Sequence, residues 1–296
     1  MEAINVDQLS NSVLTQLNHE LAETMGGDCV IINSAIFPPL DDEFRVVIEE
    51  IKRHSEENHL IVVLQTTGGY METVERLVAV MRSHYEKVSF VIPNYAFSAG
   101  TVLALSGDKI FMDYYSVLGP IDPQFMNNDG SPLPGQGYLK KFKEITEKIN
   151  EAKDAKKVRA EISFLVQKFD PAQLFSVEQG IQHGITLITE WLPKYKFKDW
   201  NKTETRGKKV TAAMKKRRAK KIAETLGDAS KWHSHGRGIS LQQLGSSDIK
   251  LLIDDFGTDD SLNEIIRNYH GLASDYIAKM GIDAYIHSMT GIRRIA

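Results

Sequence analysis

Two short segments carry the residue types that acyl-transfer chemistry needs. The paired glycines Gly68 and Gly69 follow an apolar run, and Ser98 follows another apolar run and opens a helix of small residues. Paired glycines let the backbone turn sharply and leave N–H groups free to stabilise an oxyanion. A serine at a strand-to-helix junction is well placed as a nucleophile, because the helix N-terminus favours nearby negative charge. Each segment alone is compatible with an ordinary turn or helix cap, so only their combination indicates chemistry.

The apolar periodicity places both segments at the ends of strands. The expected elements are a helix over 7–25, a strand at 30–32, a helix over 41–51, a strand at 60–64, a helix over 71–83, a strand at 88–92, a helix from residue 98 and a strand at 109–112. From residue 60 onward this is a βαβαβ series, which forms a parallel sheet with helices packed on it. Active sites of such sheets lie at the carboxyl ends of the strands, where the glycine pair and the serine are expected.

Residues 60–124 resemble the core of the Clp protease proteolytic subunit and of signal peptide peptidase A, and still more the serine dehydrogenase proteinase family. In these families a strand ends in a Gly-Gly oxyanion loop, and the nucleophilic serine follows about one helix and one strand later. Gly68, Gly69 and Ser98 take those places here. The resemblance implies an α/β fold with a ClpP/crotonase-like ββα-repeat core, a mostly parallel sheet, a long helical insertion and a helical C-terminal extension. It also implies a serine endopeptidase.

We expect the chain to divide into four stretches. Residues 1–125 form the N-terminal part of the catalytic core, and residues 226–257 close that core. Between them, residues 126–225 form a loop and a long helical region, with one amphipathic helix from 138 to 169 that packs on its own domain or on another subunit. Residues 258–296 form a helical extension. The resemblance implies a homo-oligomer, because the sister families use a helical arm in this place for assembly.

The sequence leaves the general base open. The Clp type has a histidine on the loop after the serine helix, but this chain has no histidine between His84 and His183. We favour His235, which lies shortly before a segment that resembles the one supplying the acid in the Clp type. Asp122 would orient it, in a Ser98–His235–Asp122 triad with an exchanged order along the chain. Triads are defined by geometry and not by sequence order.

Other candidates for the base are a second histidine and three lysines. His233 is the other histidine, and His235 is equally compatible with a structural role at a turn. Lys140, Lys148 and Lys153 lie in the stretch where signal peptide peptidases carry their base. A lysine in that role would need a pKa lowered by desolvation.

Composition excludes several other classes of protein. The chain of 296 residues is 42% apolar and 25% charged, as is usual for a globular protein with a sizeable core. It has no run of about 18 apolar residues, its first seven residues lack the basic start of a secretory signal, and Cys29 is its single cysteine. We therefore expect a cytoplasmic protein without a membrane span or disulfide.

No cofactor or metal is expected either. The sequence has neither a phosphate-binding glycine loop nor the spacing of a metal site. The basic stretch 194–221 is most simply a solvated helix, so nucleic acid is not the expected partner.

The expected function is hydrolysis of a peptide or protein substrate through an acyl-enzyme on Ser98. Two alternatives stay open. A catalytically inactive scaffold would explain the missing Clp-type histidine. A crotonase-type acyl-CoA enzyme would use paired backbone N–H groups without needing a serine at position 98.

Overall fold

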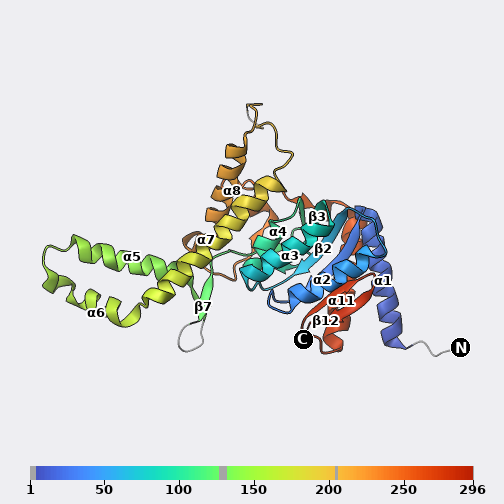
Figure 1. The fold of residues 1–296 in the computed structure, drawn as a ribbon, viewed down its shortest axis with the longest axis horizontal. Coiled ribbons are helices and arrows are strands. Elements are labelled where there is room, and N and C mark those ends of the chain that lie inside the picture. The colour runs from blue at the N-terminus through green and yellow to red at the C-terminus, as the bar shows by residue number, and fades with distance from the viewer. Residues whose placement is uncertain (1–4, 127–131, 204–205, 296) are drawn as a thin grey trace.

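The computed structural model describes residues 5–126, 132–203 and 206–295. Residues 1–4, part of the N-terminal segment compared above with a secretory signal, lie outside this range. Figure 1 shows an α/β core from which a helical arm extends to one side.

A seven-stranded sheet forms the centre of the core, in the order β10-β5-β3-β2-β1-β11-β12. Its strands are β1 (Asp28–Asn33), β2 (His59–Gln65), β3 (Lys87–Val91), β5 (Lys109–Met112), β10 (Asp254–Asp255), β11 (Tyr285–Ser288) and β12 (Gly291–Arg294). The five strands from β10 to β1 pair in parallel, whereas β11 and β12 are antiparallel to their neighbours. The expected mostly parallel sheet is therefore confirmed.

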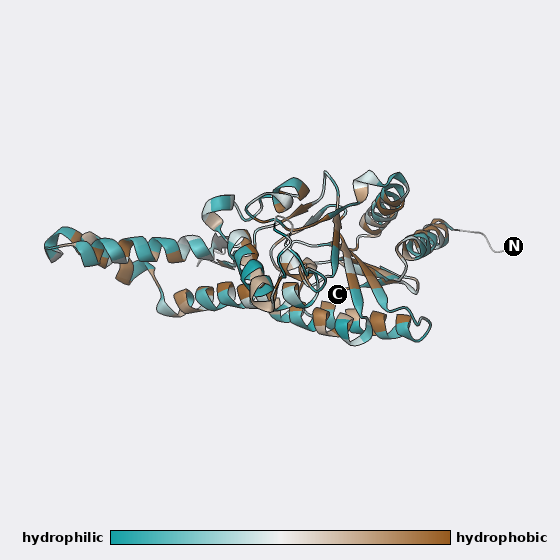
Figure 2. Ribbon diagram, turned by 90° about the horizontal axis from the view of Figure 1, so that it is seen from above, coloured by the Kyte–Doolittle hydropathy of each residue, from teal (hydrophilic) through white to brown (hydrophobic). Residues whose placement is uncertain are grey.

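Helices cover both faces of this sheet. One face carries α2 (Leu40–Lys52), α3 (Met71–His84) and α4 (Ala99–Ala104), and the other carries α1 (Val6–Met25) and α11 (Asp260–Lys279). Alternate residues of each central strand enter separate cores, so Val30 packs with the α2 and α3 side and Ile31 with the α1 and α11 side. Figure 2 shows the central strands as predominantly apolar. Burial on both faces explains why these strands are continuous apolar runs in the sequence.

A second, three-stranded sheet contains β4 (Tyr95–Ala96), β6 (Val117–Leu118) and β9 (Ile239–Ser240), in that order. β4 and β6 are parallel, while β9 runs antiparallel to β6. The carboxyl ends of β4 and β6 therefore lie at the same edge as the amino end of β9.

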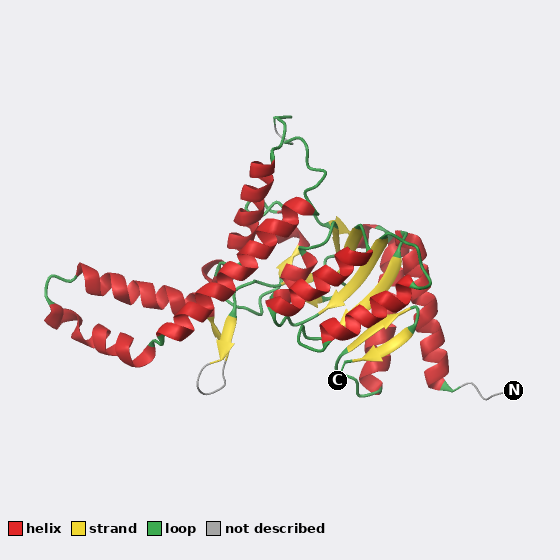
Figure 3. Ribbon diagram, viewed as in Figure 1, coloured by secondary structure: helices red, strands yellow, loops and turns green. Residues whose placement is uncertain are grey.

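The arm is built from helices that fold back on one another (Figure 3). Its elements are the hairpin β7 (Gln124–Met126) and β8 (Pro132–Pro134), then α5 (Gly135–Glu151), η1 (Ala155–Val158), α6 (Arg159–Lys168) and α7 (Pro171–Lys194). The single helix expected from 138 to 169 is wrong, because the chain breaks before η1. The side chain of Asp154 accepts a hydrogen bond from the Lys156 amide and begins a new turn there.

One longer helix and several short elements return the chain from the arm to the core. They are α8 (Ala212–Leu226), α9 (Ala229–Trp232), α10 (Leu241–Gly245) and η2 (Phe256–Thr258). Among the helices that the structure describes, none is both long and apolar enough to cross a lipid bilayer.

The C-terminal stretch differs from its expected helical form. α11 ends before Gly281, whose φ of 65° is the left-handed conformation that commonly stops a helix. The chain then forms β11 and β12, and β11 pairs antiparallel with β1. The apolar spacing of a helix continues in the sequence beyond α11. The structure of those residues is decided instead by their pairing with the distant β1.

A buried polar network joins α1, α11 and β11. The Tyr269 hydroxyl accepts a hydrogen bond from Asn18 Nδ2 at 2.8 Å and donates to His287 Nδ1 at 2.5 Å. Within the described residues, His287 Nε2 is buried without a hydrogen-bond partner. Burial lowers the pKa of His287 to about 4. The native state therefore favours the neutral imidazole.

We predict that acid weakens the fold through this histidine. Its folded pKa lies below the unfolded value near 6.5, so its contribution is complete above pH 6.5 and is lost as the pH falls toward 4. At pH 5 the loss is about 2 kcal/mol in the free energy of unfolding. Urea unfolding at pH 7 and pH 5 measures it, and His287→Gln should reduce the difference. His19→Gln, at a side chain 72% exposed, should leave it unchanged; an equal pH dependence in both variants would contradict the assignment.

Candidate active site

Ser98 connects β4 to α4 through a sharp turn. Its φ of 52° and ψ of −118° lie in a region that non-glycine residues rarely adopt. Such strain persists only where the surroundings impose it, and it concentrates at functional sites. The Thr101 amide donates to the Ser98 carbonyl at 2.9 Å, and the Ser98 side chain is half-buried. This strand-to-helix turn is a geometry that exposes a nucleophilic hydroxyl.

The glycine loop after β2 lies directly against this turn. Thr66 pairs with Ala96, and the Phe97 amide donates to the Thr66 carbonyl at 3.0 Å. A Cβ atom on Gly68, whose φ is 101°, would lie only 2.8 Å from the Ser98 Cβ. The structure therefore brings together the two segments that the sequence singles out.

Gly69 is required by a contact on the other side of the loop. A Cβ atom there would lie 2.2 Å from the carbonyl oxygen of Ile36. Two hydrogen bonds hold the backbones together at this contact. The Ile36 amide donates to the Gly68 carbonyl at 2.8 Å, and the Tyr70 amide donates to the Ile36 carbonyl at 2.9 Å. The loop is thus held between the Ile36 backbone and the Ser98 turn.

The backbone amides of the loop differ from the expected arrangement in one respect. The Gly68 amide donates to Thr66 Oγ1 at 3.1 Å, so it is already engaged in a hydrogen bond. Within the described part of the chain, the amides of Gly69 and Ala99 have no acceptor. Sequence reasoning missed Ala99. Its signal was its position directly after the serine, where acyl-transfer enzymes commonly place an oxyanion donor.

His235 and Asp122 form a hydrogen-bonded pair. His235 Nδ1 lies 3.0 Å from Asp122 Oδ1, and the Asp122 side chain is only 2% exposed. A carboxylate can only accept, so Nδ1 carries the proton and Nε2 of the neutral ring is an acceptor. This is the tautomer that a histidine base requires.

The three-stranded sheet places the His235–Asp122 pair and Ser98 at the same edge. Ala96, Leu118 and Ile239 are aligned across its three strands. Ser98 follows the end of β4, Asp122 follows the end of β6, and His235 precedes β9, so all three leave the sheet at the same edge. Thr101 Oγ1 fixes α4 to this edge, since its hydroxyl lies within hydrogen-bond distance of the Ala96 and Gly119 carbonyls, at 2.8 and 2.9 Å.

A cavity of about 220 Å³ adjoins the pair. Asp122, His233 and His235 line it, together with Lys140, whose Nζ donates to Ser230 Oγ at 3.2 Å. His233 and Lys140 are therefore the other titratable candidates near the pair.

The two remaining lysine candidates lie on the arm. Lys148 pairs with Glu161 and is 64% exposed, and Lys153 is also exposed. Neither has the burial that a lysine base requires to lower its pKa.

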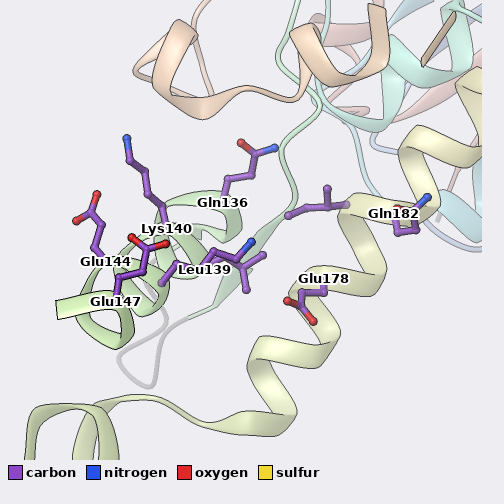
Figure 4. Close-up of a pocket in the computed structure, with 9 residues that line it drawn as sticks. Gln136, Leu139, Lys140, Glu144, Glu147, Glu178 and Gln182 are labelled. Carbon is purple, nitrogen blue, oxygen red and sulfur yellow. The ribbon is translucent and has the colours of Figure 1, made fainter. Parts of the chain in front are cut away.

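A second hollow of about 610 Å³ lies between α5 and α7. Figure 4 shows Leu139 and Glu147 on α5 and Glu178 and Gln182 on α7 beside it. Gln136 and Lys140 line both hollows. The groove between these helices therefore adjoins the cavity of His235.

Cys29 takes no part in this site. Its side chain is buried in β1, and burial raises the pKa of the thiol far above its usual range, which makes it a poor nucleophile. Across the described ranges, no three His, Cys, Asp or Glu side chains come together as a metal site would require.

We predict that Gly68→Ala destabilises the protein. The new Cβ would meet the Phe97 carbonyl oxygen and the Ser98 Cβ at 2.8 Å, in a backbone conformation unfavourable to alanine. The expected loss, on the order of 1–3 kcal/mol, is measured by urea unfolding. Gly271→Ala on α11 is the matched control, because its Cβ would meet nothing within 4 Å and alanine favours helix. Wild-type stability in Gly68→Ala would contradict the close contact with Ser98.

Comparison with known proteins gives a family match and two curated relatives. Residues 30–166 match the family model of ClpP-like SDH-type serine proteinases. Two uncharacterized proteins of Methanocaldococcus jannaschii are similar: MJ1495 is 29% identical over 105 residues, 36% of this chain and 34% of its own length. MJ0137 is 32% identical over 78 residues, 26% of this chain and 27% of its own length. The matches thus span about a third of these relatives or less.

Among solved structures, a mutant of the 1510-N membrane-bound stomatin-specific protease is similar at 14% identity and a TM-score of 0.43, over 76% of each chain. The matched segment 30–166 contains the glycine loop, Ser98 and Asp122. By this match, residues 30–166 belong to the ClpP-like SDH-type serine proteinase family.

Proposed function

We propose that this chain is a serine endopeptidase that hydrolyses peptide bonds through an acyl-enzyme on Ser98. The observation that carries the proposal is the contact between the strained Ser98 turn and the loop of Gly68 and Gly69. It supports a site where a hydroxyl and free backbone amides face one acyl carbon. The family match agrees with this reaction class.

In the proposed mechanism, Ser98 Oγ attacks the carbonyl carbon of the scissile peptide bond. The amides of Gly69 and Ala99 donate hydrogen bonds to the oxyanion of the tetrahedral intermediate. Both amides lack another acceptor among the described residues, which supports this role. Fixed backbone donors stabilise the transition state strongly, because they need no reorganisation when the charge develops.

His235 is the proposed base. Its Nε2 takes the proton from Ser98 Oγ and returns it to the leaving amine, while Asp122 holds the ring in the required tautomer. The departure of all three residues from one edge of the small sheet supports this assignment. A water then hydrolyses the acyl-enzyme with the same histidine as base. Catalytic hydrogen bonds often tighten only when substrate binds, so substrate would complete the Ser98–His235 contact.

The two alternative functions account for less of the site. A crotonase-type enzyme uses the two amides but not the hydroxyl, which leaves the strained Ser98 turn without a purpose. An inactive scaffold gives the pair of the buried Asp122 and the half-buried His235 only a structural role. We also propose that several chains assemble through the arm, as the family resemblance implies. We further propose a cytoplasmic location, because the chain has one cysteine and that cysteine is buried.

We predict that a fluorophosphonate probe labels the wild-type protein on Ser98. The probe reacts with activated serines, so Ser98→Ala should abolish labelling, measured by intact-protein mass spectrometry. Ser247→Ala, at an exposed serine before the strand β10, should label normally. A wild-type protein that stays unlabelled would refute the hydrolase and leave the scaffold or the acyl-CoA enzyme.

A second prediction concerns the base. His235→Ala should lower kcat/KM for peptide hydrolysis on the order of a thousandfold, and Asp122→Asn should also lower it strongly, because each disables the proton transfer. Lys148→Ala and Lys153→Ala are controls on the arm and should change it less than about twofold. Loss of activity in Lys140→Ala with retention in His235→Ala would assign the base to the lysine instead.

A further inference from the structure

Two exposed aromatic side chains stand beside the glycine loop. The rings of Phe37 and Tyr70 meet edge to face with their centroids 4.7 Å apart and an interplanar angle of 84°. Phe37 is 42% exposed and Tyr70 is 57% exposed. The pair thus presents an apolar surface to solvent. Both rings are large enough to bury much apolar area against a ligand.

The backbone fixes this pair relative to Ser98. Phe37 directly follows Ile36, and Tyr70 directly follows Gly69, the two residues whose backbones are in contact. The Tyr70 Cα lies at most about 7 Å from that of Gly68, because two residues of extended chain reach no further. Gly68 in turn touches Ser98. An extended peptide advances about 3.3 Å per residue, so the rings are within reach of side chains one to three positions from the scissile bond.

We propose that Phe37 and Tyr70 bind one large apolar side chain of the peptide substrate and thereby determine specificity. This inference rests on the proposed function, because the peptide is placed by its acyl carbon at Ser98. The occupant is the substrate itself, since the pair continues directly from the loop that carries the Gly69 amide. Burial of a substrate Phe, Leu or Met against the two rings would favour such sequences over those with a small or charged residue at that position.

The chain offers a matched control pair. Tyr114 and Tyr115 also lie edge to face, with centroids 6.5 Å apart and exposed fractions of 83% and 58%. They precede β6, whereas Ser98, Asp122 and His235 leave the opposite edge of the same sheet. Loss of these tyrosines tests whether any exposed aromatic pair has the same effect.

The experiment maps the bonds cut in unfolded casein by mass spectrometry. The full chain is compared with Phe37→Ala/Tyr70→Ala, with Tyr70→Phe and with Tyr114→Ala/Tyr115→Ala, and Ser98→Ala is the blank. We expect wild-type cuts to be enriched in Phe, Leu or Met at one fixed position within three residues of the scissile bond. The first double variant should lose this enrichment and lower kcat/KM for the best-cut peptide tenfold or more. Its rate of fluorophosphonate labelling should stay within about twofold of wild type.

Tyr70→Phe and the control pair should keep the enrichment, because the first retains the ring and the second lies elsewhere. An unchanged preference in Phe37→Ala/Tyr70→Ala would overturn the inference while labelling of Ser98 upholds the peptidase. Labelled protein that cuts casein without any apolar preference would overturn it in the same way. Absence of both labelling and cleavage in the wild type would overturn the proposed function, and the inference with it.

Discussion

The site depends on one close approach, that of the Gly68 backbone to the Ser98 side chain. No side chain fits between them, because a Cβ on Gly68 would lie 2.8 Å from the Ser98 Cβ. The approach is imposed from both sides. The pairing of Thr66 with Ala96 fixes the start of the loop, and the Ile36 backbone presses on Gly69 from the far side. The buried α4, held by Thr101, leaves the serine no freedom to relax its strained backbone. Strain of this kind costs on the order of 1–3 kcal/mol, so many packed contacts must hold it.

His235 is positioned by strand pairing and by its hydrogen bond to Asp122. His235 and Asp122 are 113 residues apart in the chain, and the antiparallel pairing of β9 with β6 brings their segments together. A buried carboxylate without a partner would be strongly unfavourable, so Asp122 needs the Nδ1 proton of His235 as much as the ring needs the carboxylate. The pairing therefore selects both the ring orientation and the tautomer. Strand pairing thus positions the proposed base, as the glycine loop and the turn before α4 position the proposed nucleophile.

Local patterns predicted the parts of the fold that local physics decides. The strand Lys109–Met112 and the alternation of strands and helices around it match the expectation from apolar runs. The patterns failed at β11, where the distant pairing with β1 decides the structure, and at the break before η1 in the arm, where the Asp154 side chain begins a new turn. At the site, residue types and spacing indicated Ser98 and the glycine pair. They could not indicate that Thr66 Oγ1 occupies the Gly68 amide, because that depends on the loop conformation.

The root of the arm is part of the site, whereas its tip is not. Gln136 Oε1 accepts a hydrogen bond from the Ala229 amide at 3.1 Å, so α5 is tied to the segment that leads to His235.

The other end of the arm returns to the core through Lys198. Together with Arg82, Lys198 forms a salt bridge with the buried carboxylate of Asp108. Burial alone would raise the pKa of Asp108, but hydrogen bonds from Lys198, the Val88 amide and Arg82 lower it. The carboxylate is thus held charged between two cations. Because both ends of the arm are anchored in this way, a displacement of its root would displace the His235 cavity. At the tip, α6 buries none of its residues and can change without disturbing the proposed site.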